Sequence, residues 1–154
     1  MNKIPSFEKN HNTLMPGLHE SGTANGVTTW DLRFKRPNCG DFLEQAALHS
    51  IEHMLATILR SSDKKDGIVY FGPMGCRTGF YLLTVGMNRA EVVKLLKQSF
   101  TAALELDFVP GAKQEECGNY LEHDIDGAKA ECKKYIEILN SELVVGTNNQ
   151  PIKN

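Results

Sequence analysis

The sequence predicts an α+β fold, in which a mainly antiparallel sheet packs against helices in one compact domain covering residues 1–154. Alternating apolar and polar residues indicate strands at 27–35, 68–71 and 79–85. Helical periodicity occurs at 42–60, at 88–106 and from about 124 to 142. The strands and helices do not alternate strictly, which argues against a parallel sheet. A chain of 154 residues, 41% of them hydrophobic, is sufficient for one domain with a core.

The first predicted strand follows a polar stretch. We expect residues 1–25 to be irregular, because they are polar and show no periodicity. The strand at 27–35 is expected to be half-buried, because its two faces differ in polarity. One face carries Trp30, Leu32 and Phe34, and the other carries Asp31, Arg33 and Lys35.

Capping and breaking residues set the predicted boundaries of the later elements. Asp41 is placed to cap the helix that follows it, and Asn88 with Glu91 forms a capping-box pattern before the next helix. Residues 72–78 contain two glycines and a proline, which predicts a tight and unusual turn between two strands. Pro110-Gly111 breaks the chain before the last helix.

Composition and charge exclude several classes of protein. The net charge of −2 gives no basic field for nucleic acid or an anionic membrane. No apolar run approaches the ~20 residues that span a bilayer, and the polar first ten residues carry no signal-peptide segment. We therefore expect a cytoplasmic protein, with no nucleic-acid or membrane partner, whose four cysteines stay reduced.

A metal-binding pattern lies within the helix predicted at 42–60. His49, Glu52 and His53 form the motif H-x-x-E-H. Residues four apart project from the same face of a helix, so both imidazoles can bind one metal ion. The Glu52 carboxylate lies beside them and is free to move protons. Two histidines hold a metal poorly, so a third ligand is expected, with an open position if the site is catalytic.

The four cysteines have different surroundings. Cys117 lies in a short loop before the last helix, from which a thiol can reach a helix face, and we choose it as the third ligand. Cys76 lies on the glycine-rich turn next to Arg77, where a thiol is placed to ionise. Cys132 shares a helical face with apolar residues, which predicts a buried core thiol. Cys39 receives no role.

These segments resemble the S-ribosylhomocysteine lyase family, LuxS, whose product is the precursor of autoinducer-2. The resemblance extends from near the start of the chain to the last helix. It depends most on the H-x-x-E-H motif in combination with Pro73-Met74-Gly75-Cys76. The other matching segments are Ser6-Phe7 with His11, Trp30-Asp31-Leu32-Arg33-Phe34 with Pro37-Asn38, Arg77-Thr78-Gly79-Phe80-Tyr81, and Cys117-Gly118.

The resemblance implies a role for each site residue. The implied metal ligands are His49, His53 and Cys117. The implied acid and base are Glu52 and Cys76, with Arg33 supporting the Cys76 thiolate or orienting the sugar. The residues implied to hold the homocysteine end of the substrate are Ser6, His11 and Arg60.

The implied reaction needs a metal and no redox cofactor. One divalent ion per subunit, iron(II) with zinc or cobalt as alternatives, would polarise the carbonyl of the opened ribose. Proton transfers would then move the carbonyl along the sugar until homocysteine leaves by β-elimination, giving 4,5-dihydroxy-2,3-pentanedione as the second product. Donor types alone would favour zinc. Family members are homodimers with two sites at the subunit interface, each borrowing residues from the partner.

Some residues depart from the family pattern, and two other functions remain open. Lys35 replaces a common cysteine, and Tyr70 and Gly72 replace a common aspartate and serine. Because of the changes at Tyr70 and Gly72, substrate contacts near the 72–78 turn are not expected to follow the family pattern. One rival function is a small zinc peptidase of the inverted-motif type, with Glu131 as the third ligand. The other is a metal-binding module without catalysis.

Overall fold

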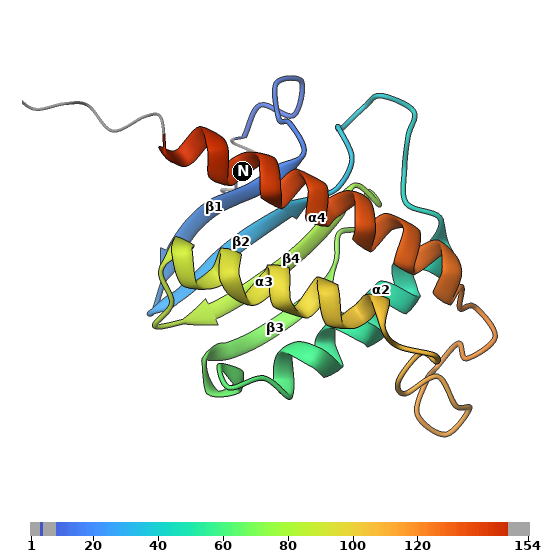
Figure 1. Cartoon of the computed structure of the whole chain (residues 1–154). Coiled ribbons are helices and arrows are strands. Elements are labelled where there is room, and N and C mark those ends of the chain that lie inside the picture. The colour runs from blue at the N-terminus through green and yellow to red at the C-terminus, as the bar shows by residue number, and fades with distance from the viewer. Residues whose placement is uncertain (1–3, 5–8, 148–154) are drawn as a thin grey trace, which may run out of the picture.

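A four-stranded antiparallel sheet, in the order β1-β2-β4-β3, forms one layer of the computed structural model, which describes residue 4 and residues 9–147. Its strands are β1 (Gly17–Ala24), β2 (Val27–Arg33), β3 (Ile68–Pro73) and β4 (Gly79–Val85). The helices of the second layer are α2 (Gln45–Arg60), α3 (Arg89–Leu104) and α4 (Ile125–Thr147) (Figure 1). The predicted class, α+β with an antiparallel sheet in one compact domain, is confirmed.

The core lies between the sheet and the helices. Alternate residues of a strand face one side, and the fully buried hydrophobic ones on the core face of the two central strands are Trp30, Leu32, Phe80 and Leu82. Phe34, just after β2, stacks on Tyr135 of α4 with the ring centroids 4.1 Å apart. Cys132 is buried in the same core, and burial, with Glu131 contributing less, raises its thiol pKa to about 12. The prediction of a buried core thiol is therefore confirmed.

The expectation that residues 1–25 are irregular is wrong for β1. This edge strand pairs with β2 through the two-residue turn Asn25-Gly26, whose φ angles are 52° and 79°. Such a turn, with both residues left-handed, is typical of a tight hairpin. The register is irregular between Glu20 and Gly22, which disturbs the alternation that would have marked the strand.

The expectation that Asp41 caps α2 is also wrong. The helix begins at Gln45 without a side-chain cap. The backbone amide of Leu43 donates to the Arg77 carbonyl at 2.9 Å, which holds the preceding residues outside the helix. Asp41 forms an ion pair with Lys35 instead, at 3.2 Å.

The other boundaries agree more closely. The capping box of Asn88 and Glu91 is present in both directions, and α3 ends two residues before the predicted position. The last helix begins where expected and continues past the predicted end, to Thr147. Arg77 has a φ of 58°, which is rare for a residue other than glycine and confirms the unusual turn. None of the described helices is both long and apolar enough to cross a membrane.

The strand predicted as half-buried is buried on both faces. Asp31 and Arg33 are 1% and 2% exposed, because they pair with each other and lie beneath Lys9 of the N-terminal segment. Lys35 lies beyond the end of β2 and does not share their face. Its ammonium group reaches Glu131 of α4 at 3.1 Å.

Candidate metal centre

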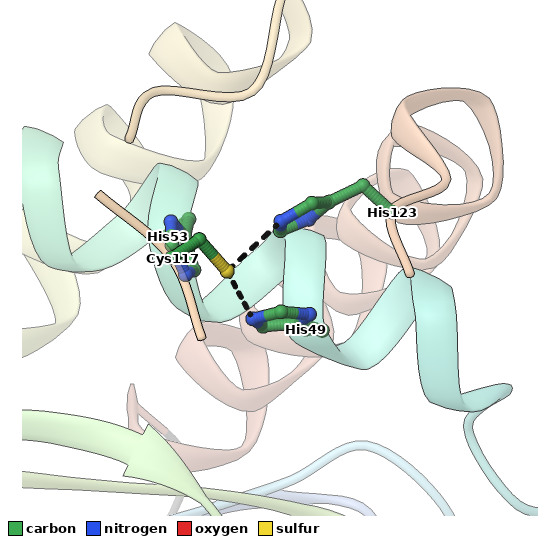
Figure 2. Close-up of side chains that lie close together, drawn as sticks. All are labelled: His49, His53, Cys117 and His123. Carbon is green, nitrogen blue, oxygen red and sulfur yellow. Dashed lines mark hydrogen bonds between the residues drawn. The ribbon is translucent and has the colours of Figure 1, made fainter. Parts of the chain in front are cut away.

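Four side chains from two segments converge beside α2. His49 and His53 lie one turn apart on the helix, and the segment between α3 and α4 contributes Cys117 and His123 (Figure 2). Their ligand atoms all lie within 4.8 Å of one another. The Cys117 sulfur is 3.5 Å from His49 Nε2 and 3.7 Å from His123 Nε2. The sequence-predicted trio is thus brought together, with one additional imidazole.

Hydrogen bonds to the backbone orient the two helix imidazoles. Nδ1 of His49 is 2.9 Å from the Glu122 carbonyl oxygen, and Nδ1 of His53 is 2.9 Å from the Pro110 carbonyl oxygen. A carbonyl has no proton to give, so each Nδ1 is the donor. In a neutral ring Nε2 is then an acceptor facing the cluster, which is the arrangement typical of metal-binding histidines.

The segment between α3 and α4 provides these carbonyl oxygens. Gly111 has a φ of 68°, and a Cβ there would lie 3.2 Å from His53 Nδ1. The Pro110-Gly111 break therefore serves to aim the Pro110 carbonyl at the imidazole. Cys117 is 8% exposed, and its sulfur accepts a hydrogen bond from the Asn119 amide at 3.4 Å.

The donor set fits a divalent transition metal. With metal–nitrogen bonds near 2.0 Å and metal–sulfur bonds near 2.3 Å, a tetrahedral site has sulfur–nitrogen edges of about 3.5 Å. The two sulfur–nitrogen distances of 3.5 and 3.7 Å match that edge. Burial, followed by the nearby His49 and His53, lowers the pKa of His123, which keeps this imidazole neutral and able to bind a cation.

Sequence reasoning missed His123. The available signal was its position six residues after Cys117 in the same loop, directly before the last helix. The Asp124 side chain caps that helix by accepting from the Gly127 amide at 2.9 Å.

The ligand that the peptidase alternative needs lies elsewhere. Glu131 forms ion pairs with Lys35 at 3.1 Å and with Lys134 at 3.0 Å. Cys117 stands where that alternative would place Glu131. The inverted-motif peptidase therefore loses its third ligand.

A second polar cluster lies on the opposite face of the sheet. Both Arg33 and Asp31 alternate with core residues of β2, so they face away from the helices. The guanidinium group binds the carboxylate in a bidentate manner, at 3.0 and 2.6 Å. It also donates to the Thr78 hydroxyl at 2.6 Å and lies 3.9 Å from the Cys76 sulfur. The Thr78 oxygen is 3.0 Å from the same sulfur.

The cation beside Cys76 is therefore Arg33 rather than its neighbour in sequence. Arg77 turns away, with its guanidinium carbon 5.7 Å from the centre of the Phe42 ring. A hollow of about 310 Å³ adjoins the cluster, lined among others by Lys9, Arg33 and Tyr81. Burial, followed by the charge of Asp31, raises the pKa of Tyr81. The tyrosine therefore faces the hollow as a neutral phenol.

The remaining predicted residues are spread over the chain. Glu52 lies on α2 between the two histidines, and within the described part of the chain its carboxylate forms no ion pair or hydrogen bond. His11 donates to the Lys9 carbonyl at 2.9 Å. Arg60 is the exposed last residue of α2. Ser6 lies outside the described residues.

Tyr70 and Gly72, two of the residues expected to depart from the family pattern, lie against each other. Tyr70 folds over Gly72, so that a Cβ at Gly72 would overlap the phenol group. Gly72 also pairs across the sheet with Tyr81, which lines the hollow. The tyrosine in this orientation therefore requires a glycine at position 72, and the two residues act as a pair on the face that carries Cys76.

The fold and the four-residue cluster define a small α+β protein with a candidate metal site. Residues 4–144 match the S-ribosylhomocysteinase (LuxS) family. S-ribosylhomocysteine lyase of Borreliella burgdorferi is 46% identical over 148 residues, which cover 92% of this chain and 94% of that protein. The same enzyme of Finegoldia magna is 42% identical over 147 residues, with the same coverage. The enzyme of Phocaeicola vulgatus is 45% identical over 143 residues, covering 88% of this chain and 89% of its own. The chain belongs to the LuxS family.

Proposed function

We propose that this chain is a cytoplasmic S-ribosylhomocysteine lyase. It cleaves the thioether of S-ribosylhomocysteine to homocysteine and 4,5-dihydroxy-2,3-pentanedione, the precursor of autoinducer-2. Family membership over residues 4–144 supports the substrate. The observation that carries the proposal is the convergence of two imidazoles from H-x-x-E-H with the Cys117 thiol.

The proposed metal ligands are His49, His53 and Cys117. They hold one divalent ion per subunit, which we propose to be iron(II), with zinc or cobalt as alternatives. When bound, the ion supplies Lewis acidity that makes the C–H bonds next to a sugar carbonyl acidic. The chain's own contribution is to fix two neutral imidazoles by their Nδ1–H bonds to carbonyl oxygens.

Glu52 and Cys76 are the proposed acid and base. The Glu52 carboxylate is available because no cation holds it among the described residues. Arg33 and Thr78 both approach the Cys76 sulfur, and the Thr78 oxygen already accepts a hydrogen bond from Arg33. Both groups can therefore donate to the sulfur, which suits a thiolate that takes and returns a proton.

The arrangement of the two clusters supports a homodimer. Two members of the imidazole cluster, His49 and His53, lie on α2, in the helical layer (Figure 1). Arg33 alternates with core residues of β2 and so faces away from the helices, and its guanidinium group lies 3.9 Å from the Cys76 sulfur. A single substrate needs both, and one chain holds them on opposite sides of its sheet. We propose that a second copy presents its sheet face to the metal centre, giving two sites at the interface. The residues proposed to hold the homocysteine end are Ser6, His11 and Arg60.

The test is release of a thiol from the substrate. Anaerobically purified protein, loaded with iron(II), is incubated with S-ribosylhomocysteine, and free homocysteine is measured with a thiol reagent. Turnover by the loaded protein and none after chelation is the expected result. Absence of thiol release from protein with full metal content would contradict the assignment. The Cys39→Ala variant is the matched control, because it removes an exposed thiol with no proposed role.

A further inference from the structure

We propose that Lys9 is a positioning residue for the chemistry of Cys76, and that it acts through Asp31 and Arg33. This inference rests on the proposed function and concerns the cluster on the sheet. The Lys9 side chain reaches that cluster from the N-terminal segment, 22 positions before Asp31 in the sequence. Its contribution is a positive charge that the carboxylate of Asp31 cannot cancel for both of its partners.

The ammonium group of Lys9 is held by two neighbouring strands. It donates to the hydroxyl of Ser21, on β1, at 2.7 Å. It also forms an ion pair with Oδ2 of Asp31, on β2, at 3.5 Å. The Lys9 side chain is 24% exposed and that of Asp31 is 1% exposed, so the ammonium group lies at the boundary between the buried cluster and the solvent. Two partners therefore place this charge directly beside the carboxylate.

The carboxylate of Asp31 is shared between two cations. Nη2 of Arg33 donates to Oδ2 at 2.6 Å, the same oxygen that Lys9 approaches, and Nε donates to Oδ1 at 3.0 Å. Two cations and one anion leave the group of Lys9, Asp31 and Arg33 with a net charge of +1. The neutral phenol of Tyr81 lines the same hollow and adds no charge to it.

The free side of the Arg33 guanidinium group faces Cys76. Its Nη1 donates to the Thr78 hydroxyl at 2.6 Å and lies 3.9 Å from the Cys76 sulfur. A thiolate at Cys76 would bring the cluster to neutrality. Without Lys9, Asp31 and Arg33 would already balance each other, and a thiolate would add an uncompensated negative charge. Since a nearby opposite charge favours the ionised form of a group, Lys9 favours the thiolate.

Alkylation of Cys76 by iodoacetamide tests the proposal without substrate. The rate is measured on the purified protein at one fixed pH, and the modified cysteine is identified by peptide mass spectrometry. Lys9→Met and Lys9→Gln are expected to slow the reaction by about 3- to 10-fold, because less of Cys76 is thiolate. Lys9→Arg keeps the charge and is expected to react within about twofold of the wild type. Lys64→Met is the matched control, because it removes one positive charge from the exposed ion pair with Glu91.

A structural role for Lys9, limited to docking the N-terminal segment, predicts other results. Wild-type alkylation rates in both neutral variants would overturn the proposal. Equal slowing in Lys9→Arg and Lys9→Met would also overturn it, because the effect would then depend on the shape of the side chain and not on its charge.

Turnover provides a second readout. In the neutral variants, kcat for thiol release is expected to fall by about the same factor as the alkylation rate, with KM within about twofold of the wild type. A raised KM with unchanged alkylation would overturn the proposal and make Lys9 a substrate contact. Failure of the proposed function is a separate result, because it appears as absence of thiol release from the wild type, whereas the alkylation rates need no substrate.

Discussion

The two polar clusters of this chain are built in opposite ways. The cluster beside α2 consists of three imidazoles and a thiol, with no carboxylate. The ligand atoms of its four side chains converge. The cluster on the sheet consists of a buried cation and a buried anion that satisfy each other, Arg33 and Asp31, with Thr78 and Cys76 at its edge. Both use side chains that sequence patterns mark as polar.

The difference shows how local chemistry separates binding from proton transfer. The single proton of the Cys117 thiol cannot satisfy both imidazole nitrogens that face it, so the cluster beside α2 favours a bound cation. In the sheet cluster the Asp31 carboxylate already pairs with Arg33 and Lys9, and the Cys76 sulfur lies beside two donors. Changes in the first cluster should therefore alter metal binding, and changes in the second should alter turnover or stability.

The largest effect is expected at the proposed proton-transfer residues. Cys76→Ala and Glu52→Gln should each retain metal and lower turnover by about 10²–10⁴-fold, because a positioned acid or base contributes that much. Metal content and thiol release are measured on the same samples. Metal depletion in Cys76→Ala would show that the sheet thiol, and not Cys117, is a ligand.

A smaller effect is expected on stability when the buried ion pair is broken. Asp31→Ala leaves the guanidinium of Arg33 buried beside Thr78 without its carboxylate partner. Such a loss costs about 3–5 kcal/mol, measured as the free energy of unfolding of the metal-free protein in denaturant. His49→Ala, in the same assay without metal, should change it far less. Equal losses in the two variants would remove the distinction between the clusters.

The smallest effect is expected at the coupled pair on β3. Gly72→Ser should cost about 1 kcal/mol, because the Tyr70 phenol must move off the new Cβ. The cost should vanish when Tyr70→Ala is added, and that non-additivity in a double-mutant cycle is the measurement. Additive costs would mean that the two residues do not constrain each other.

Much of the fold could be predicted because hydrophobic periodicity and caps act locally. The Asn88 capping box and the turn that carries Cys76 are fixed by residues close in sequence. The edge strand β1 was missed, although the Asn25-Gly26 hairpin signal was present, because a register irregularity disturbed its alternation. The Asp41 cap failed because Leu43 bonds to a residue 34 positions away, which no local pattern reveals.

The site residues also divide into those that local sequence determines and those that depend on distant residues. Both histidines of H-x-x-E-H were predictable because helix geometry alone aligns them, and Cys117 because it lies in a loop. His123 was not predicted, since its direction depends on the Ser50 hydroxyl, 73 positions away in sequence. The burial of Arg33 likewise depends on Lys9 and Asp31, so the strand pattern alone suggested a solvent-exposed face.

The metal content of Cys117→Ala tests the central claim most directly. Wild type and variant are purified anaerobically, and divalent metal per chain is measured by elemental analysis, with Cys39→Ala as the control. The account predicts one ion per chain in the wild type and control, and almost none in Cys117→Ala, with thiol release lost in parallel. Full metal content in Cys117→Ala would contradict it.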